Sequence, residues 1–350
     1  MAQSWLSAVD ELSPAALTVT AQSVSPTDQG KLYWSGFCPR QNVDSVNLAE
    51  VTTLDDRPAA DRREWNQRGR HVPPRTPARR EVSIVPIEAY DKLGEYEMQR
   101  LNERFDANQS KMANIIGVSI PDRVKRLALA DYRRLELDFW TAWTLGTITQ
   151  RNPQNAAETH AASFGFSGSR ITTAGTAWSS VSDAYAEFIA WLEDALDAMG
   201  SLSGVVMRQN TLAVIQADAP DLIGGVSMTR AQLIQRIQDD LGQAMFVQVV
   251  EDTVDVYDDG GTATTATKVL SAGRIAAIPA DGRIGYTAFA PVVRAMEMAR
   301  AVPAAGIDTN GVTVYYDEAG TGRELTIEAQ VNALPVPDEA RIFVINTQVA

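Results

Sequence analysis

Cysteine and histidine are almost absent from this chain of 350 residues. Its one cysteine, Cys38, has no partner for an internal disulfide bond, and the two histidines, His71 and His160, lie far apart in the sequence. These numbers exclude a disulfide scaffold and a zinc site built from cysteine and histidine within one chain. Cys38 stands between an aromatic residue and a proline, and we predict that it is a small packing residue rather than a reactive thiol.

Long apolar runs are missing as well. The charge-free stretch 139–150 contains threonine and glutamine, and it is shorter than the roughly 18 apolar residues that a membrane span needs. Asp10 and Glu11 stand where a secretory signal would need a basic start followed by an unbroken apolar stretch. We therefore expect a soluble protein that is made in the cytoplasm and has no membrane partner.

Recognisable catalytic motifs are also lacking. The sequence contains no GxxxxGK[ST] phosphate loop, no HExxH zinc motif and no GxSxG nucleophile turn, and Ser167 is expected to lie in an ordinary turn. The acidic stretch 252–259 fails as a calcium loop, because Tyr257 and Ala266 would occupy two of the ligand positions. Any of the 44 carboxylates could meet in space, but nothing selects a pair. We predict no catalytic residue, no metal and no cofactor.

The charge of the chain is distributed unevenly. The formal net charge is −13 at pH 7, which argues against a protein whose main task is to bind DNA or an anionic membrane. Segment 57–80 nevertheless carries a net charge of +6, because eight arginines face only Asp61 and Glu64, so the rest of the chain carries −19. Four prolines keep this segment from forming a long helix or a central strand.

Three interpretations of this arginine segment remain open. It could be a flap that crosses an acidic surface of a neighbouring copy, a nucleic-acid contact with Trp65 as a stacking residue, or a solvated loop. The acidic remainder of the chain favours the flap. The candidate contact residues are Arg57, Arg62, Arg63, Trp65, Arg68, Arg70, Arg75, Arg79 and Arg80.

The length favours two compact units with extensions over one core. Residues 1 to about 115 have little periodicity, so we expect them to be ordered by neighbouring copies and not by their own chain. A long helix is predicted over 121–146, beginning at Pro121. Its apolar stripe consists of Ala128, Tyr132, Leu135, Phe139 and Trp143. Segment 147–178 suggests short strands joined by turns.

Further elements alternate along the second half, which gives an α+β class. Helices are predicted over 183–199, with Ser180 and Asp183 as a capping pair, and over 229–241. Strand-like or otherwise ordered segments are 205–207, 211–217, 246–257, 264–270, 324–333 and 341–347. A hairpin is expected between 246–257 and 264–270, with its tip at Asp258, Asp259, Gly260 and Gly261. The last two strands are expected to pair antiparallel across a rigid turn at 334–338.

The order of these parts resembles the major capsid proteins of tailed bacteriophages, which have the Hong Kong 97 fold, and in particular the lambda-type branch. The stretches that carry the resemblance are RRLELDFWTAWTLGTIT, GTAWSS, DTVDVYDDGGTATTATKVL, IPADGRIGYT and GRELTIEAQVNALPVPDEARIFVINTQVA. The resemblance implies an N-terminal arm at 1–49, an extended basic loop at 50–92, and a peripheral domain with a spine helix at 93–180. It also implies an axial domain at 181–299, with the hairpin tip near the capsomer centre, and peripheral return strands at 300–350.

The same resemblance implies a structural protein of the virion capsid that is not an enzyme. Copies would form pentamers and hexamers of an icosahedral head around double-stranded DNA, without sequence-specific DNA binding. Scaffolding, portal and decoration proteins would be its partners. Two alternatives stay open from the residues: a host-encoded nanocompartment shell of the same fold, and a cytosolic α+β enzyme with an unrecognised carboxylate site.

Overall fold

The computed structural model describes residues 13–25, 32–52, 78–93, 96, 109–152, 155–181, 183–218, 228–257, 264–318 and 325–349. The helices are α1 (Pro14–Gln22), α2 (Trp34–Phe37), α4 (Gln109–Leu145), α5 (Ala184–Met199), α6 (Gln209–Asp218), α7 (Arg230–Leu241) and α8 (Val293–Ala301), with 3-10 turns η2 (Trp178–Ser180), η3 (Pro303–Ala305) and η4 (Glu339–Arg341). The strands are β1 (Arg40–Asn42), β2 (Asn47–Thr52), β3 (Ala78–Ser83), β4 (Ile87–Leu93), β5 (Thr147–Asn152), β6 (Asn155–Ser163), β7 (Ile171–Thr173), β8 (Leu202–Met207), β9 (Phe246–Val249), β10 (Thr253–Tyr257), β11 (Thr264–Lys268), β12 (Arg274–Pro279), β13 (Gly285–Ala290), β14 (Thr313–Glu318), β15 (Leu325–Pro337) and β16 (Val344–Asn346).

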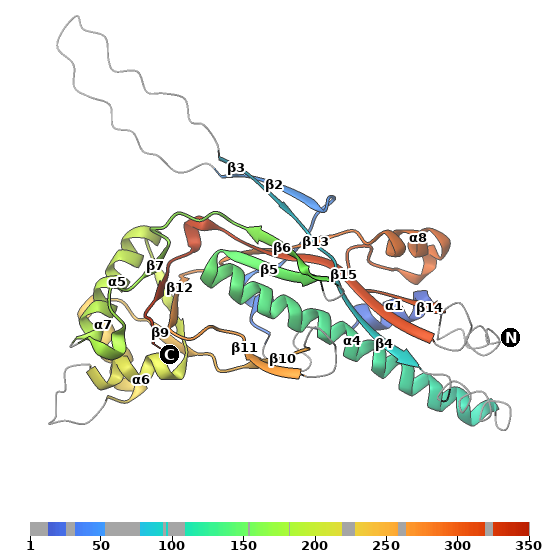
Figure 1. Ribbon diagram of the computed structural model, residues 1–350, viewed down its shortest axis with the longest axis horizontal. Coiled ribbons are helices and arrows are strands. Elements are labelled where there is room, and N and C mark those ends of the chain that lie inside the picture. Colours follow the sequence, from blue (N-terminus) through green and yellow to red (C-terminus); the bar gives the residue numbers. More distant parts are fainter. Residues whose placement is uncertain are drawn as a thin grey trace, which may run out of the picture.

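One long helix packed on one sheet forms the first two layers of the fold. The sheet has the order β1-β13-β15-β14, and β4 also pairs with β15. Helix α4 packs along β15 and β4 and crosses much of the molecule (Figure 1). The predicted stripe of α4 is confirmed, because all five of its residues are buried in the core against this sheet. No helix in the described part of the chain is long and apolar enough to cross a membrane.

The predicted start of this helix is wrong. Helix α4 begins at Gln109, and Pro121 lies inside it. Proline lacks a backbone N–H and crowds the preceding turn, which is why it predicts a helix start. Ile120 and Val124, on either side of it, are buried in the core, so tertiary packing outweighs the local preference. The predicted end is correct to one residue, and Gly146 follows with a φ of 68°.

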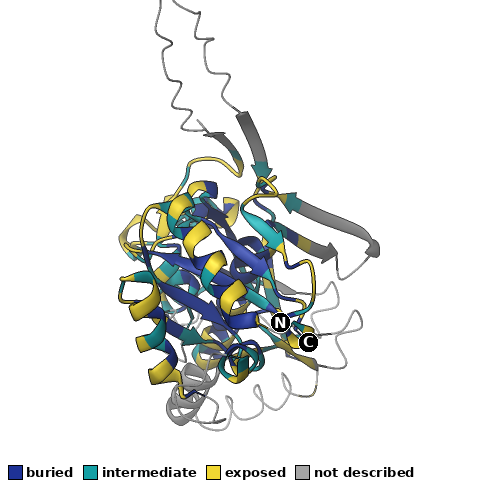
Figure 2. Ribbon diagram, turned by 90° about the vertical axis from the view of Figure 1, so that its left-hand side faces the viewer, coloured by how far each residue is buried: buried dark blue, intermediate teal, exposed yellow. Residues whose placement is uncertain are grey.

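A second sheet, in the order β7-β16-β12-β8-β9, has a different hydrophobic group on each face. Along β12, Ala276 belongs to the core around α4, whereas Ile275 and Ala277 belong to a second core with α5, α6 and α7. These helices turn their exposed sides outward and their buried sides toward the strands (Figure 2). The sheet therefore joins two cores, as the alternation of side chains along a strand allows.

The helices of this second core follow their sequence signals. Helix α5 ends at Gly200, which has a φ of 80°, and Asp183 caps its start by accepting the backbone N–H of Ala186. Ser180 is not the cap, because it belongs to η2. Helix α7 has a capping box formed by Thr229 and Gln232. The predicted strand 246–257 divides into β9, which joins β8, and β10, which pairs with β11.

The predicted antiparallel pair of the last two strands is wrong. Strand β15 continues through Pro335 and Pro337, and β16 lies in the other sheet, between β7 and β12. Pro335 faces Thr287 of β13, which donates its backbone N–H to Pro39 on its other side. Thr287 and Pro335 are thus a pair without ladder hydrogen bonds, where the missing proline N–H costs nothing.

Several described segments of the N-terminal third pack in the core of their own chain. Leu17 of α1 and Trp34 of α2 are buried in the core around α4, as are Ile87 and Leu93 of β4. The expectation that these segments pack only on other copies is therefore wrong. The predicted domain boundaries stay a prediction; in the structure β4 and β13 lie in the first sheet, and β16 lies in the second.

Candidate assembly interface

The ladder of β2 and β3 is the described base of the arginine segment. The two strands pair antiparallel over six positions, and among the described residues they pair only with each other. They project from the body of the molecule (Figure 1). A two-stranded ladder is marginally stable in water by itself. This part of the chain therefore needs support from a surface outside its own ladder.

The inner end of the ladder is held firmly by the body. Ile84 is buried, and its backbone N–H donates to Val46 at 2.7 Å. The Ser83 hydroxyl lies 2.9 Å from Asn47 Oδ1, which closes the last rung. Ile84 packs in a small hydrophobic cluster with Ile148 of β5 and residues of β13 and β15. The direction in which the segment leaves the body is thus set by packing.

Only two of the predicted contact residues lie in described elements. Arg79 and Arg80 are in β3, opposite Val51 and Glu50 of β2. The other candidates lie outside the described residues, namely Arg57, Arg62, Arg63, Trp65, Arg68, Arg70 and Arg75. The predicted tip residues Asp258, Asp259, Gly260 and Gly261 lie outside them as well.

The hairpin that leads to this tip is confirmed, with β10 and β11 paired from Thr253 to Tyr257. Glu251 holds its base: its carboxylate lies 2.9 Å from Lys268 Nζ and 3.5 Å from Arg208 Nε, and it accepts the backbone N–H of Gln209. Desolvation raises the pKa of Glu251, but the hydrogen bonds from Lys268 and Gln209 outweigh it, so that the pKa lies below its usual value. The base of the hairpin is therefore anchored to the start of α6.

Three buried carboxylates on α4 were missed by the sequence analysis. Asp131, Glu136 and Asp138 are each about 2% exposed or less. Burial raises the pKa of Asp131 well above its ordinary value, and the charge of Glu88 adds to the shift. Burial also raises the pKa of Glu136 to about 7, against the opposing effect of its hydrogen bonds. A signal existed, since Asp131 lies three residues after Ala128 and hence on the apolar stripe.

None of these three acids lines the cavity between α1, α2 and β13. A cavity of about 430 Å³ lies between α1, α2 and β13, and its described lining, which includes Arg40, Tyr132 and Phe289, contains no carboxylate. In the described part of the chain, no group of three or more His, Cys, Asp or Glu residues could hold a metal ion. A carboxylate enzyme would need acids in a pocket. Asp131 and Glu136 lie in the packed core instead, so this cavity does not favour the alternative of an enzyme with a carboxylate site.

The comparison of structures found similar proteins, whereas the comparisons of sequence did not. No family model and no curated protein matches the sequence. A crystal structure named as a prophage capsid protein of Escherichia coli CFT073 superimposes with a TM-score of 0.53 and 14% identity, over 95% of this chain and 97% of that one. The chain has a capsid protein fold. It is the Hong Kong 97-type fold that the resemblance predicted, with α4 as the spine helix.

Two further solved structures are similar to this capsid fold. A phage-related protein from Bordetella bronchiseptica RB50 has a TM-score of 0.48 and 12% identity, with 95% of each chain covered. The capsid of a native GTA particle has a TM-score of 0.47 and 14% identity, with 92% of this chain and 93% of that chain covered. The assignment to the lambda-type branch stays a prediction.

Proposed function

We propose that this chain is the major capsid protein of a tailed bacteriophage. The observation that supports the proposal is a capsid fold that extends over 95% of the chain. Copies would form pentamers and hexamers and then an icosahedral shell around double-stranded DNA, assembled in the host cytoplasm. The protein would act as a structural component and not as an enzyme. Scaffolding, portal and decoration proteins would be its partners, and DNA would lie near it without sequence-specific contacts.

The projecting ladder gives this proposal a physical basis. Strands β2 and β3 pair only with each other among the described residues, so a neighbouring copy would supply the surface that they lack. Ordering of the loop and association of subunits would then contribute to one free energy. Contacts of this kind bury on the order of 2,000 Å² or more in obligate assemblies.

We further propose that the arginine segment acts as a flap on an acidic surface of the neighbouring copy. Its net charge of +6 against −19 for the rest of the chain supports this choice. Guanidinium groups form paired hydrogen bonds with carboxylates, which fixes orientation as well as contact. The hairpin tip at Asp258, Asp259, Gly260 and Gly261 would point toward the capsomer centre.

Assembly itself tests the main proposal. The purified chain is expected to form capsomers or particles tens of nanometres across in negative-stain images and light scattering. A 38 kDa monomer at high protein concentration, across a range of salt and pH, would refute the proposal. The contents of purified particles distinguish a phage head from the alternative, a host-encoded nanocompartment. A phage head holds nuclease-resistant DNA, whereas a nanocompartment holds a protein cargo.

Charge reversal tests the flap. Changing Arg62, Arg63, Arg79 and Arg80 to Glu should abolish assembly while the helical content of the subunit, measured by circular dichroism, stays unchanged. The matched control replaces the same four residues by Lys, which keeps the charge but loses the paired hydrogen bonds. If the Glu variant still forms normal particles, the flap does not act through charge.

A further inference from the structure

The three buried carboxylates of the spine helix differ in how they are satisfied. Asp138 forms an ion pair with Arg134 of the same helix at 2.9 Å. Among the described residues, neither oxygen of Asp131 has a hydrogen-bond partner. Glu136 accepts hydrogen bonds from its own helix and from α2, and it thereby connects the spine helix with another segment of the chain.

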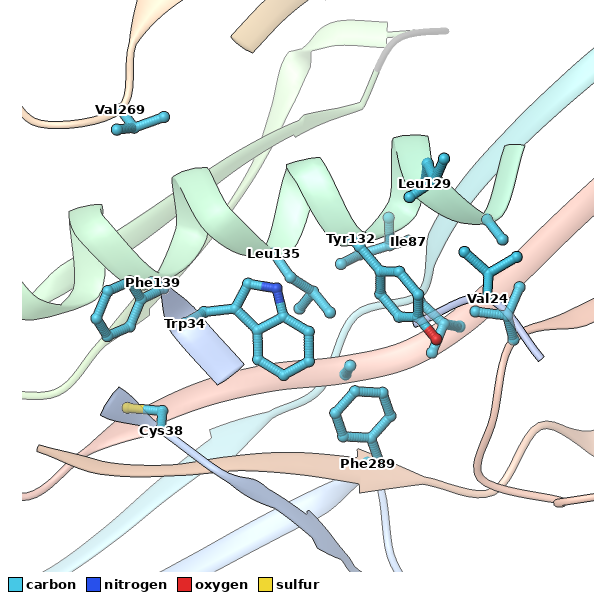
Figure 3. Close-up of a cluster of buried hydrophobic side chains, with 14 of the residues drawn as sticks. Val24, Trp34, Cys38, Ile87, Leu129, Tyr132, Leu135, Phe139, Val269 and Phe289 are labelled. Carbon is cyan, nitrogen blue, oxygen red and sulfur yellow. The ribbon is translucent and has the colours of Figure 1, made fainter. Parts of the chain in front are cut away.

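The second segment held by Glu136 is α2. One carboxylate oxygen accepts the backbone N–H of Trp34, the first residue of α2, at 3.0 Å, and the other accepts the indole N–H of Trp140 at 2.6 Å. Trp34 lies between Leu135 of α4 and Phe289 of β13 (Figure 3). The carboxyl group of Glu136 is therefore a polar link in an otherwise apolar contact.

Aromatic rings complete the contact between α2 and α4. Tyr33 meets Trp140 edge to face, with ring centroids 5.7 Å apart. Phe37 stacks on Phe139 at 6.0 Å and contacts Trp143 at 5.3 Å. Such pairs stabilise the contact beyond the apolar area that they bury. The apolar part of the contact does not depend on pH, so any pH dependence must come from Glu136 and its polar neighbours.

The electrostatic surroundings of Glu136 disfavour its negative charge. Asp252, just before β10, acts on it with a charge of the same sign. Tyr33, on the α2 side, interacts with both Glu136 and Asp252, and Gln248 of β9 is an uncharged neighbour of Tyr33. The groups that offset these effects are the N–H donors named above and the backbone N–H of Tyr33, and no cation of the described residues contributes. Within the described part of the chain, ionised Glu136 is thus buried without a counter-charge.

We propose that Glu136 is a proton-controlled latch that fixes α2 to the spine helix when protonated and loosens α2 when ionised. In the open state the carboxyl group is hydrated and its charge costs little. The docked state therefore binds the proton more tightly than the open state does. The chain continues from α2 through β1 to β2, so release of α2 would also loosen the segment that leads to the base of the arginine segment. That consequence for assembly rests on the proposed function, whereas the latch itself does not.

The sign and size follow from proton linkage. The pKa of Glu136 is about 7 in the docked state, against an ordinary value of 4.5 for an exposed glutamate. A raised pKa means that the docked state is favoured fully below about pH 4.5, and that this advantage is lost as the pH rises to about 7. The opening equilibrium should therefore increase on the order of 100-fold between pH 4.5 and pH 8.

Hydrogen exchange on the unassembled full chain tests the latch. Two reporter amides are Phe37 and Cys38, which donate to Tyr33 and Trp34. After correction for intrinsic exchange rates, their protection should fall on the order of 100-fold from pH 5 to pH 8 in the wild type. Glu136→Gln should remove this pH dependence. The control Glu187→Gln, at an exposed position of α5, should leave it unchanged.

A second variant keeps the test decisive if Glu136→Gln does not fold. Asp252→Asn removes the neighbouring like charge and so lowers the pKa of Glu136 in the docked state, which means that the fall in protection should level off at a lower pH and have a smaller amplitude. Protection of α2 that is independent of pH in the wild type, or an unchanged profile in Asp252→Asn, overturns the latch. Particle images of the same proteins under assembly conditions separate this failure from failure of the proposed function, because shells can form without a latch.

Discussion

Replacement of Leu17 by alanine tests whether α1 belongs to the core of its own subunit. Leu17 is fully buried in the cluster around α4, and α1 packs against both β14 and α4. Its neighbour Thr18 exchanges two hydrogen bonds with the backbone of Val314, at 3.1 and 3.0 Å, so the helix cannot easily shift to fill a void. We therefore expect Leu17→Ala to lower the free energy of unfolding by about 2 to 5 kcal/mol.

The expected change in melting temperature follows from chain length. An unfolding entropy of about 2.1 cal/mol/K per residue gives roughly 0.7 kcal/mol/K for this chain, so the midpoint should fall by about 3 to 7 °C. The assay is thermal unfolding of dispersed subunits, because shell contacts add stability of their own. Val19→Ala, at a position 39% exposed on the same helix, is the control and should change stability by about 0.5 kcal/mol or less.

The result that would refute this reasoning is specific. If Leu17→Ala leaves the midpoint of dispersed subunits unchanged but lowers that of assembled shells, α1 belongs to the core of a neighbouring copy. The original expectation for the N-terminal arm would then be restored, and the packing of α1 described above would be wrong.

Three further substitutions probe other parts of the fold. Gly204→Ala should destabilise the subunit, because a Cβ atom there would lie 2.3 Å from the backbone oxygen of Phe246, whereas Gly36→Ala, with open space around it, should be close to neutral in the same denaturation assay. Leu192→Ala should lower the urea midpoint by an amount equivalent to about 2 to 5 kcal/mol, and an unchanged midpoint would remove α5 from the core. Burial raises the pKa of Asp131, so the wild type should lose stability relative to Asp131→Asn as the pH rises above the ordinary range of a carboxyl group. Urea titrations at pH 5 and pH 8 measure this, and the same stability difference between the two proteins at both pH values would contradict it.

Elements with local end signals could be predicted from the sequence. Helices α5 and α7 combine a helical apolar period with a capping side chain at the start and a glycine of positive φ after the end. The hairpin of β10 and β11 was likewise marked by its turn residues. In each case the residues that fix the element lie within a few positions of it.

Elements decided by distant contacts could not be predicted. Pro121 was interpreted as a helix start and Pro335 as part of a turn, but α4 continues through the first and β15 through the second. Helix α1 was missed because its buried face, Leu17, Thr18 and Ala21, depends on packing against β14 and α4. Local propensity is a weak predictor where tertiary packing opposes it.

The candidate interface and the buried acids also contain some features that the sequence could reveal and others that it could not. Charge counting found the arginine segment, and an acid at a stripe position gave a hint of Asp131. The partner of Glu136 could not be found, because Trp34 lies 102 positions earlier in the chain. Sequence patterns identify which residues are unusual, whereas the contacts between distant residues require the fold.

The position of β16 has a consequence for biosynthesis. This strand fills the gap between β7 and β12, and its residue Val344 lies 172 positions after Thr172 of β7. The second sheet therefore stays open during translation until the segment around residue 346 has left the ribosome. If the proposed function is correct, only polypeptides that have been translated through this strand could join a growing shell.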